Sequence, residues 1–171
     1  MKTLKNKFTL LILITTAFLG VQAQQNALKM HSGNIIPSRF KIQYERRLND
    51  KFSTGMIGSV FINNFKGYRL EPYGRFYVGN NASVFDGMFF QLKGHYTYVT
   101  DNSPMKEITK EYGASMCVGY QTSFASGITA EFFIGSRSSK RTYKTVSESA
   151  ELFKIFYCLP VDMGLSIGYA F

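Results

Sequence analysis

The last eleven residues of the chain alternate strictly between two kinds of side chain, and this feature constrains the fold most. One face of this segment is wholly apolar and carries Met163, Leu165, Ile167, Tyr169 and Phe171. The intervening positions hold only small or polar residues. A period of two is the period of a β-strand whose two faces meet different surroundings.

The same alternation recurs through most of the chain. It is clear at residues 40–45, 88–98, 112–121 and 128–135, and weaker at 52–62 and 68–78. We therefore expect an all-β protein. In residues 68–78 the apolar face includes Pro72, which cannot donate a ladder hydrogen bond, so a β-bulge is expected there.

The first twenty-three residues have the pattern of a secretory signal peptide. Three lysines precede the apolar run from Leu10 to Gly20, and Val21-Gln22-Ala23 supplies a cleavage site. The run is shorter than the roughly 18 residues that a spanning helix needs. We expect a signal peptide at 1–23 and one domain at 24–171. Cleavage would lower the net charge from +9 by the three lysines to +6; export excludes nucleic acid as a partner and leaves an anionic membrane.

The connections between the predicted strands alternate in length. Tight turns are expected near 49–50, 79–81 and 123–126, and longer loops at 63–67, 100–106 and 136–159. Outer-membrane barrels have an even number of strands, short periplasmic turns and long outer loops. With both termini in the periplasm, the strand at 39–47 needs a partner before it, which places a first strand at Asn26–Ile35. The apolar stretch Leu152–Leu159 then falls in the last outer loop, as a plug, a short helix or an extension of the final strand.

An alternating eight-stranded barrel has two physical solutions. The apolar face can point inward, as in a soluble periplasmic lipocalin-like barrel with an apolar ligand, or outward into lipid. Small residues on the polar face suit a narrow lumen, charges of both signs can pair there, and tyrosines on the apolar face suit the membrane interfaces. The expected fold is therefore an eight-stranded antiparallel up-and-down transmembrane β-barrel of the outer membrane.

Two sets of charged residues are candidate sites. The first should form a paired lumenal network, because unpaired buried charges are costly; it comprises Lys41, Glu45, Arg69, Glu71, Arg75, Lys93 and Glu131. Side chains fill a barrel of eight strands, which disfavours a channel. The second set is a basic cluster in the last outer loop, solvated or in contact with lipid phosphates; it comprises Arg137, Lys140, Arg141 and Lys144.

Histidines and cysteines offer little chemistry. His31 and His95 are expected to face inward near the outer rim, with no further metal ligands close in sequence. A lipid-modifying enzyme at the rim could use His95 with Asp101 and Ser103, or His31 with Ser32, but their spacing is not specific. We expect no catalytic residue, cofactor or metal. Cys117 and Cys158 are expected too far apart for a disulfide, and therefore to be free thiols.

Three segments resemble a known family: "NALKMHSGNIIPSRFKIQYERRLNDKFS", "EPYGRFY" and "MGLSIGYAF". They look like a family of small, uncharacterised outer-membrane β-barrels, a domain of unknown function, from Bacteroidetes-type bacteria. The resemblance implies an exported, membrane-embedded barrel with a structural or surface-interaction role, and supplies no catalytic residue. The last strand also resembles the signal read by the barrel assembly machinery, with Tyr169 and Phe171 at its aromatic positions and Ser166 where glycine is usual.

Overall fold

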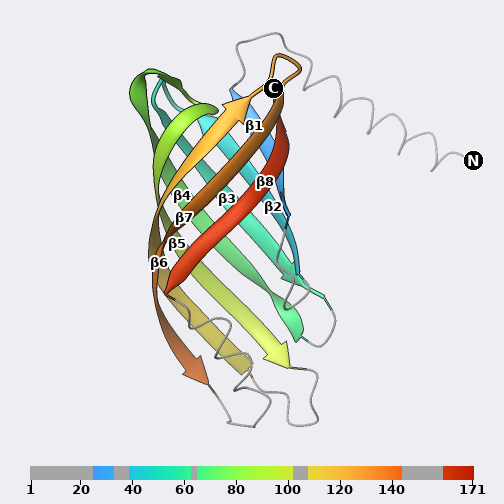
Figure 1. Ribbon diagram of the computed structural model, residues 1–171. Coiled ribbons are helices and arrows are strands. Elements are labelled where there is room, and N and C mark those ends of the chain that lie inside the picture. Colours follow the sequence, from blue (N-terminus) through green and yellow to red (C-terminus); the bar gives the residue numbers. More distant parts are fainter. Residues whose placement is uncertain (1–24, 33–38, 63–64, 102–107, 144–159) are drawn as a thin grey trace, which may run out of the picture.

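Eight antiparallel strands form a closed barrel in the computed structural model, which describes residues 25–32, 39–62, 65–101, 108–143 and 160–171 (Figure 1). Each strand pairs with its neighbours in the sequence, and β1 closes the sheet against β8. The strands are β1 (Asn26–Ser32), β2 (Arg39–Arg47), β3 (Phe52–Phe61), β4 (Phe65–Ser83), β5 (Asp86–Asp101), β6 (Ile108–Ser123), β7 (Ile128–Tyr143) and β8 (Val161–Ala170). The predicted all-β class and strand count are confirmed.

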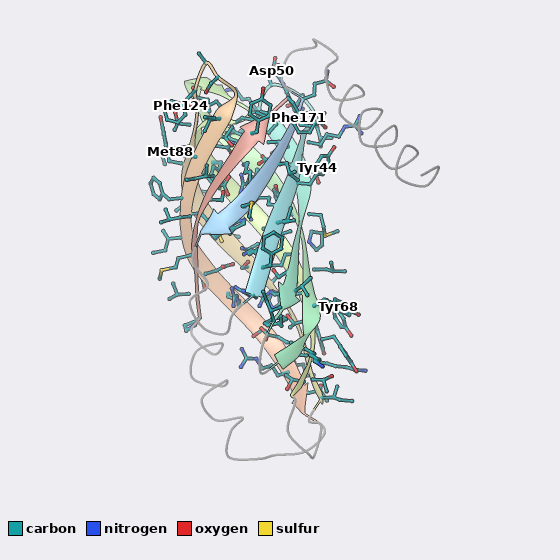
Figure 2. All side chains as sticks on the ribbon, turned by 90° about the vertical axis from the view of Figure 1, so that its right-hand side faces the viewer. Tyr44, Asp50, Tyr68, Met88, Phe124 and Phe171 are labelled. Atoms are coloured by element: carbon teal, nitrogen blue, oxygen red, sulfur yellow. The ribbon has the colours of Figure 1, made fainter. Side chains whose placement is uncertain are left out.

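The two ends of the barrel differ. The start of β1 and the end of β8 meet at one end, where Asn26 N donates to Phe171 O at 2.9 Å and Phe171 N donates to Asn26 O at 2.8 Å. The connections β2–β3, β4–β5 and β6–β7 lie at this same end, which we call the turn end (Figure 1). We call the opposite end, toward which β1, β3, β5 and β7 run, the loop end. Asp50, Phe124 and Phe171 mark the turn end in Figure 2, with Tyr68 toward the loop end.

The alternating pattern sorts side chains between the outside and the lumen. On β8, Met163, Leu165 and Ile167 are exposed, whereas Asp162 and Ser166 are buried. The same order holds on β6, where Tyr112, Met116 and Tyr120 are exposed while the odd-numbered positions between them face inward. The apolar face therefore points outward and the polar face points into the lumen.

Glycine on the inner face makes room for large side chains from other strands. A Cβ on Gly119 would lie 2.4 Å from Phe132 O and 2.5 Å from Phe89 Cζ. Phe89, Tyr77 and Phe133 belong to an apolar cluster that fills the lumen near the turn end. Phe85 joins this cluster with a φ of 76°, a conformation that its burial in the cluster stabilises.

Two expectations about strand ends were wrong. Strand β7 continues to Tyr143, so residues 136–143 are strand and not loop. Strand β4 passes through the expected turn at 79–81 and ends at Ser83, and the chain reverses at Val84 and Phe85. The first strand begins where predicted, and residues 33–35 of its expected range lie outside the described residues.

The expected bulge at Pro72 was also wrong. Leu70 pairs with Tyr96 and Tyr73 with Lys93, so the register between β4 and β5 is the same on both sides of Pro72. Pairing is interrupted at residues 71–72 without an inserted residue. The register shifts instead between Val78 and Ser83, next to the turn. Within the described residues, no helix is long and apolar enough to span a membrane.

Candidate functional site

The structure places all seven predicted network residues in the lumen and divides them between two clusters. The first, the turn-side cluster, consists of Lys29, Glu45, Arg75 and Glu131, from β1, β2, β4 and β7. The second, the loop-side cluster, lies toward the loop end and contains the predicted Lys41, Arg69, Glu71 and Lys93 together with His95, Glu111, Arg137, Arg141 and Asp162.

The turn-side cluster pairs two cations with two carboxylates. Lys29 Nζ lies 2.6 Å from Glu45 Oε2 and 2.6 Å from Glu131 Oε2. Arg75 Nη1 lies 2.9 Å and 2.7 Å from the same two oxygens, and Arg75 Nη2 donates to Glu131 Oε1 at 2.9 Å. All four side chains are buried. Each charge therefore has two opposite charges as direct partners, and the cluster is neutral.

Neutral polar side chains complete the turn-side cluster. Lys29 Nζ donates to Gln121 Oε1 at 2.9 Å, and Tyr77 Oη lies 2.7 Å from the same oxygen. The Arg75 guanidinium also donates from Nε to Gln91 Oε1 at 2.7 Å and lies 4.2 Å from the centre of the Phe89 ring. A low-dielectric site of this kind makes each satisfied contact stronger and each missing one more costly.

The loop-side cluster contains more cations than carboxylates. Lys93 Nζ lies 2.8 Å from Asp162 Oδ2, and Lys41 Nζ and Arg69 Nε lie 3.3 Å and 3.2 Å from Glu71. The five cations Lys41, Arg69, Lys93, Arg137 and Arg141 share the three carboxylates Glu71, Glu111 and Asp162. This half of the lumen therefore carries a net positive charge among the residues named.

Sequence reasoning missed Lys29 and Asp162 as members of these clusters. Both occupy inward positions on their strands, Lys29 on β1 and Asp162 on β8. Their place in the two-residue alternation of each strand could have identified them, since a charged residue on the polar face of an alternating strand points into the lumen. The two strands that close the barrel thus each contribute a charge.

The predicted basic loop cluster was wrong because Arg137, Lys140 and Arg141 belong to β7. Alternation along the strand turns Arg137 and Arg141 toward the lumen, where they lie 3.0 Å from Asp162 and 3.1 Å from Glu111. Lys140 faces outward and is exposed. Lys144 lies outside the described residues. The four basic side chains therefore do not form one surface patch.

Both histidines face inward as expected, but only His31 lies near the loop end of its strand, one residue before β1 ends at Ser32. His31 Nε2 lies 2.6 Å from Gln43 Oε1, and His95 Nε2 lies 3.3 Å from Glu111 Oε1. The longer strands place the row containing Arg69 and Glu111 between His95 and the loop end. The Asp101 and Ser32 side chains, and Ser103 altogether, fall outside what the structure describes.

Metal binding and disulfide formation find little support in the described part of the chain. It holds no group of three or more His, Cys, Asp or Glu side chains that could bind a metal ion. Cys117 is a buried free cysteine, with its Sγ 3.7 Å from Asp162 Oδ2. Cys158 lies outside the described residues, so its free thiol stays a prediction.

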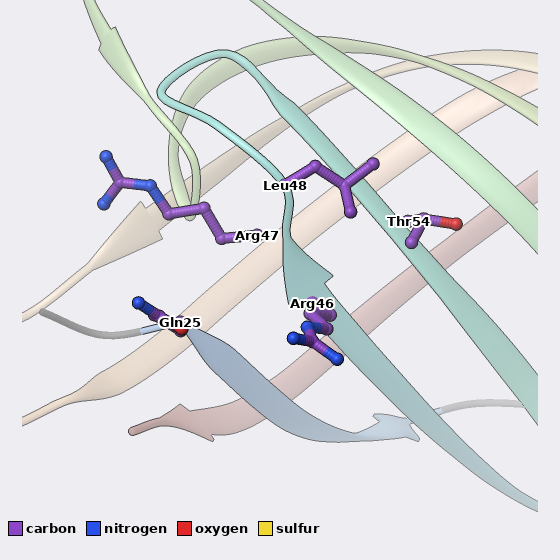
Figure 3. Close-up of a pocket in the computed structure, with 5 residues that line it drawn as sticks. All are labelled: Gln25, Arg46, Arg47, Leu48 and Thr54. Carbon is purple, nitrogen blue, oxygen red and sulfur yellow. The ribbon is translucent and has the colours of Figure 1, made fainter. Parts of the chain in front are cut away.

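A hollow of about 640 Å³ lies outside the lumen at the turn end, lined by Gln25, Arg46, Arg47, Leu48 and Thr54 (Figure 3). Arg47 is ion-paired with Asp50 in the adjacent turn. The hollow is open and lies beside the start of β1, the end of β2 and the start of β3. We find no convergent set of catalytic groups in its lining.

Comparison with protein-family models, curated proteins and solved structures gave no match. The resemblance to uncharacterised outer-membrane barrels therefore rests on the three sequence segments alone. Function has to be inferred from the geometry of the barrel, its lumen and its outer wall.

Proposed function

We propose that this chain is a non-enzymatic outer-membrane β-barrel protein with a structural or surface-interaction role. The observation that carries the proposal is the inverted distribution of polarity. The wall exposes large apolar side chains such as Met116 and Met163, 64% and 67% exposed, while Arg69 and Glu45 in the lumen are fully buried. Exposed apolar area of this extent is favourable in lipid and costly in water.

Aromatic side chains on the outer wall support a membrane position. Tyr68, Tyr96 and Tyr112 lie toward the loop end, whereas Tyr120 and Tyr169 lie toward the turn end. On β6 the eight steps from Tyr112 to Tyr120 rise about 26 Å along the strand. A strand tilt of about 40° reduces this to about 20 Å along the barrel axis, comparable to the apolar band of about 25 Å in such barrels.

The filled lumen argues against transport. Charged and polar side chains are buried there, and in the turn-side cluster charged side chains from β1, β2, β4 and β7 form ion pairs across the barrel. A conducting pore would need a continuous water-filled path. In the described part of the barrel, buried charged side chains such as Arg69, Arg75 and Lys93 occupy the lumen where a lipocalin-like barrel would hold an apolar ligand. The role is thus assigned to the barrel wall and the surfaces that it presents.

Membrane extraction of the full chain tests the proposal. The protein should remain in the outer-membrane fraction, require detergent for extraction and migrate differently on a gel before and after boiling. Met116→Arg, in the middle of the apolar wall, should destabilise the inserted barrel by about 2–4 kcal/mol, whereas Thr142→Arg near the loop end should cost about 1 kcal/mol or less. Recovery of the native chain in the osmotic-shock fluid would refute the proposal and favour the soluble barrel.

A further inference from the structure

Lysine side chains gather on the outer wall near the loop end. Lys66, Lys110 and Lys140 are all exposed on outward-facing positions of β4, β6 and β7. None of them has an ion pair with another residue that the structure describes. They differ in this from Arg137 and Arg141, which form ion pairs in the lumen with Asp162 and Glu111.

Lys110 and Lys140 are diagonal neighbours on one face of the sheet. Lys140 pairs with Tyr112, and Lys110 pairs with Thr142, so the two lysines are offset by two residues across the β6–β7 ladder. Side chains in this relation have Cβ atoms about 7 Å apart. Like charges at this spacing repel each other, and a single anion between them would remove the repulsion.

A groove lies on the outer wall directly beside this pair. Its volume is about 770 Å³, and its lining includes Lys140, Tyr96, Tyr112, Pro72, Gly94 and Ala114. Gly94 pairs with Ala114, which pairs with Ser138, so a row of small side chains crosses three strands. A Cβ added at Gly94 would make only ordinary van der Waals contacts, with Gly113 O and Pro72 Cγ at 3.9 Å. Its small size thus keeps the groove open and is not required by the backbone.

We propose that this surface binds one membrane lipid with a phosphate in its headgroup. Lys110 and Lys140 contact the phosphate, and an acyl chain lies in the groove over Gly94 and Ala114. The inference rests on the proposed membrane position. In that position the tyrosines beside the lysines mark the membrane interface, and the groove lies toward the middle of the wall. The two parts of the site therefore match the order of headgroup and acyl chain in a leaflet.

Spin-labelled lipids can measure this selectivity in reconstituted protein. The full mature chain is inserted in phosphatidylcholine bilayers, and the immobilised fraction of spin-labelled phosphatidic acid is compared with that of phosphatidylcholine with the same acyl chains. Two lysines near a lipid surface should give the native chain a preference of about thirtyfold for phosphatidic acid. Lys110→Gln/Lys140→Gln should abolish most of this preference. The matched control, Arg46→Gln/Lys51→Gln at the turn end, should retain most of it.

The groove is tested separately. Gly94→Leu fills the groove without a backbone clash and should reduce the immobilised fraction of phosphatidic acid. Gly74→Leu, at an outward glycine that is also free of close contacts and lines a different groove, should not. Inorganic phosphate at constant ionic strength should displace little of the lipid; complete displacement would show a site for free phosphate and overturn the lipid assignment.

The outcomes separate this inference from the proposed function. A chain that fails to insert into bilayers contradicts the membrane position itself. A chain that inserts but shows equal preference for the two lipids, or whose preference survives Lys110→Gln/Lys140→Gln, contradicts only the lipid site. Loss of the preference in the turn-end control to the same extent would show general attraction to a basic protein, and would also refute a specific site.

Discussion

Arg75→Met should be among the most destabilising substitutions in this barrel. Arg75 makes three contacts of 2.7–2.9 Å with Glu45 and Glu131, and the substitution would leave both carboxylates buried with Lys29 as their shared cation. Removing one partner from a buried ionic group costs about 3–5 kcal/mol, since the remaining charge stays in the interior uncompensated. We expect a loss of this size in the free energy of unfolding.

A compensating substitution separates charge from packing. Glu131→Gln alone should also destabilise the barrel, because it leaves one excess positive charge in the turn-side cluster. The double variant Arg75→Met/Glu131→Gln keeps the cluster neutral, with Lys29 against Glu45. Its destabilisation should be smaller than the sum of the two single effects by at least about 1.5 kcal/mol.

Urea unfolding of the refolded chain in lipid vesicles measures these differences. The folded and unfolded forms are separated on a gel without boiling, and the four proteins of the cycle are compared at equilibrium. Additivity within about 0.5 kcal/mol would refute the reasoning. It would mean that Arg75 stabilises the barrel through its packing against Phe89 and Tyr73, and not through its charge.

Three further predictions follow from single contacts. Gly119→Ala should cost about 1–3 kcal/mol in urea unfolding, because its Cβ would meet Phe132 O at 2.4 Å, whereas Gly58→Ala, with no atom within 4 Å, should be near neutral. Lys93→Met should destabilise the barrel by about 3 kcal/mol, because it removes an ion-pair partner of the buried Asp162. Arg137 pairs with the same carboxylate but its side chain is 12% exposed, so Arg137→Met should lower the free energy of unfolding by less; equal losses would contradict this difference in burial. In a Cys158→Ser background, Cys117 should react with a water-soluble maleimide only after denaturation, and rapid labelling of the folded protein would contradict its inward position.

The parts of the fold that the sequence predicted are those with contrasting faces. The strand ending at Ala170 alternates between exposed apolar and buried polar positions, so its pattern identifies both its structure and its sides. The end of β7 has no such contrast. Residues 136–143 are polar at almost every position, and they form a strand because backbone hydrogen bonds to β6 extend beyond the apolar wall. No hydrophobic period marks such a segment.

The position of the β4–β5 turn shows how packing can override local preference. Gly79, Asn80 and Asn81 are typical turn residues, but the chain reverses at Val84 and Phe85 instead. Both of these side chains are buried against the apolar cluster at the turn end. Burial of the two outweighs the local preference of the Gly-Asn-Asn segment. To predict this turn from the sequence, one would need to know that an apolar cluster fills the lumen near the turn end.

The charged clusters add a constraint that the hydrophobic pattern cannot supply. A shift of one residue in the register of a strand would turn its apolar side chains into the lumen and its polar side chains outward, which is unfavourable. A shift of two residues leaves every apolar side chain outside. Such a slip moves a side chain by about 6.6 Å along its neighbour, beyond the reach of an ion pair. In β1 it would separate Lys29 from Glu45 and Glu131, which lie 2.6 Å away in the observed register. We therefore infer that the turn-side cluster fixes the register of β1 against the rest of the barrel, in addition to stabilising the fold. The double variant Lys29→Met/Glu131→Gln also keeps the cluster neutral, with Arg75 against Glu45, and it removes both ion pairs of Lys29. It should therefore show a second set of backbone NMR resonances from a slipped register; a single set would contradict this role.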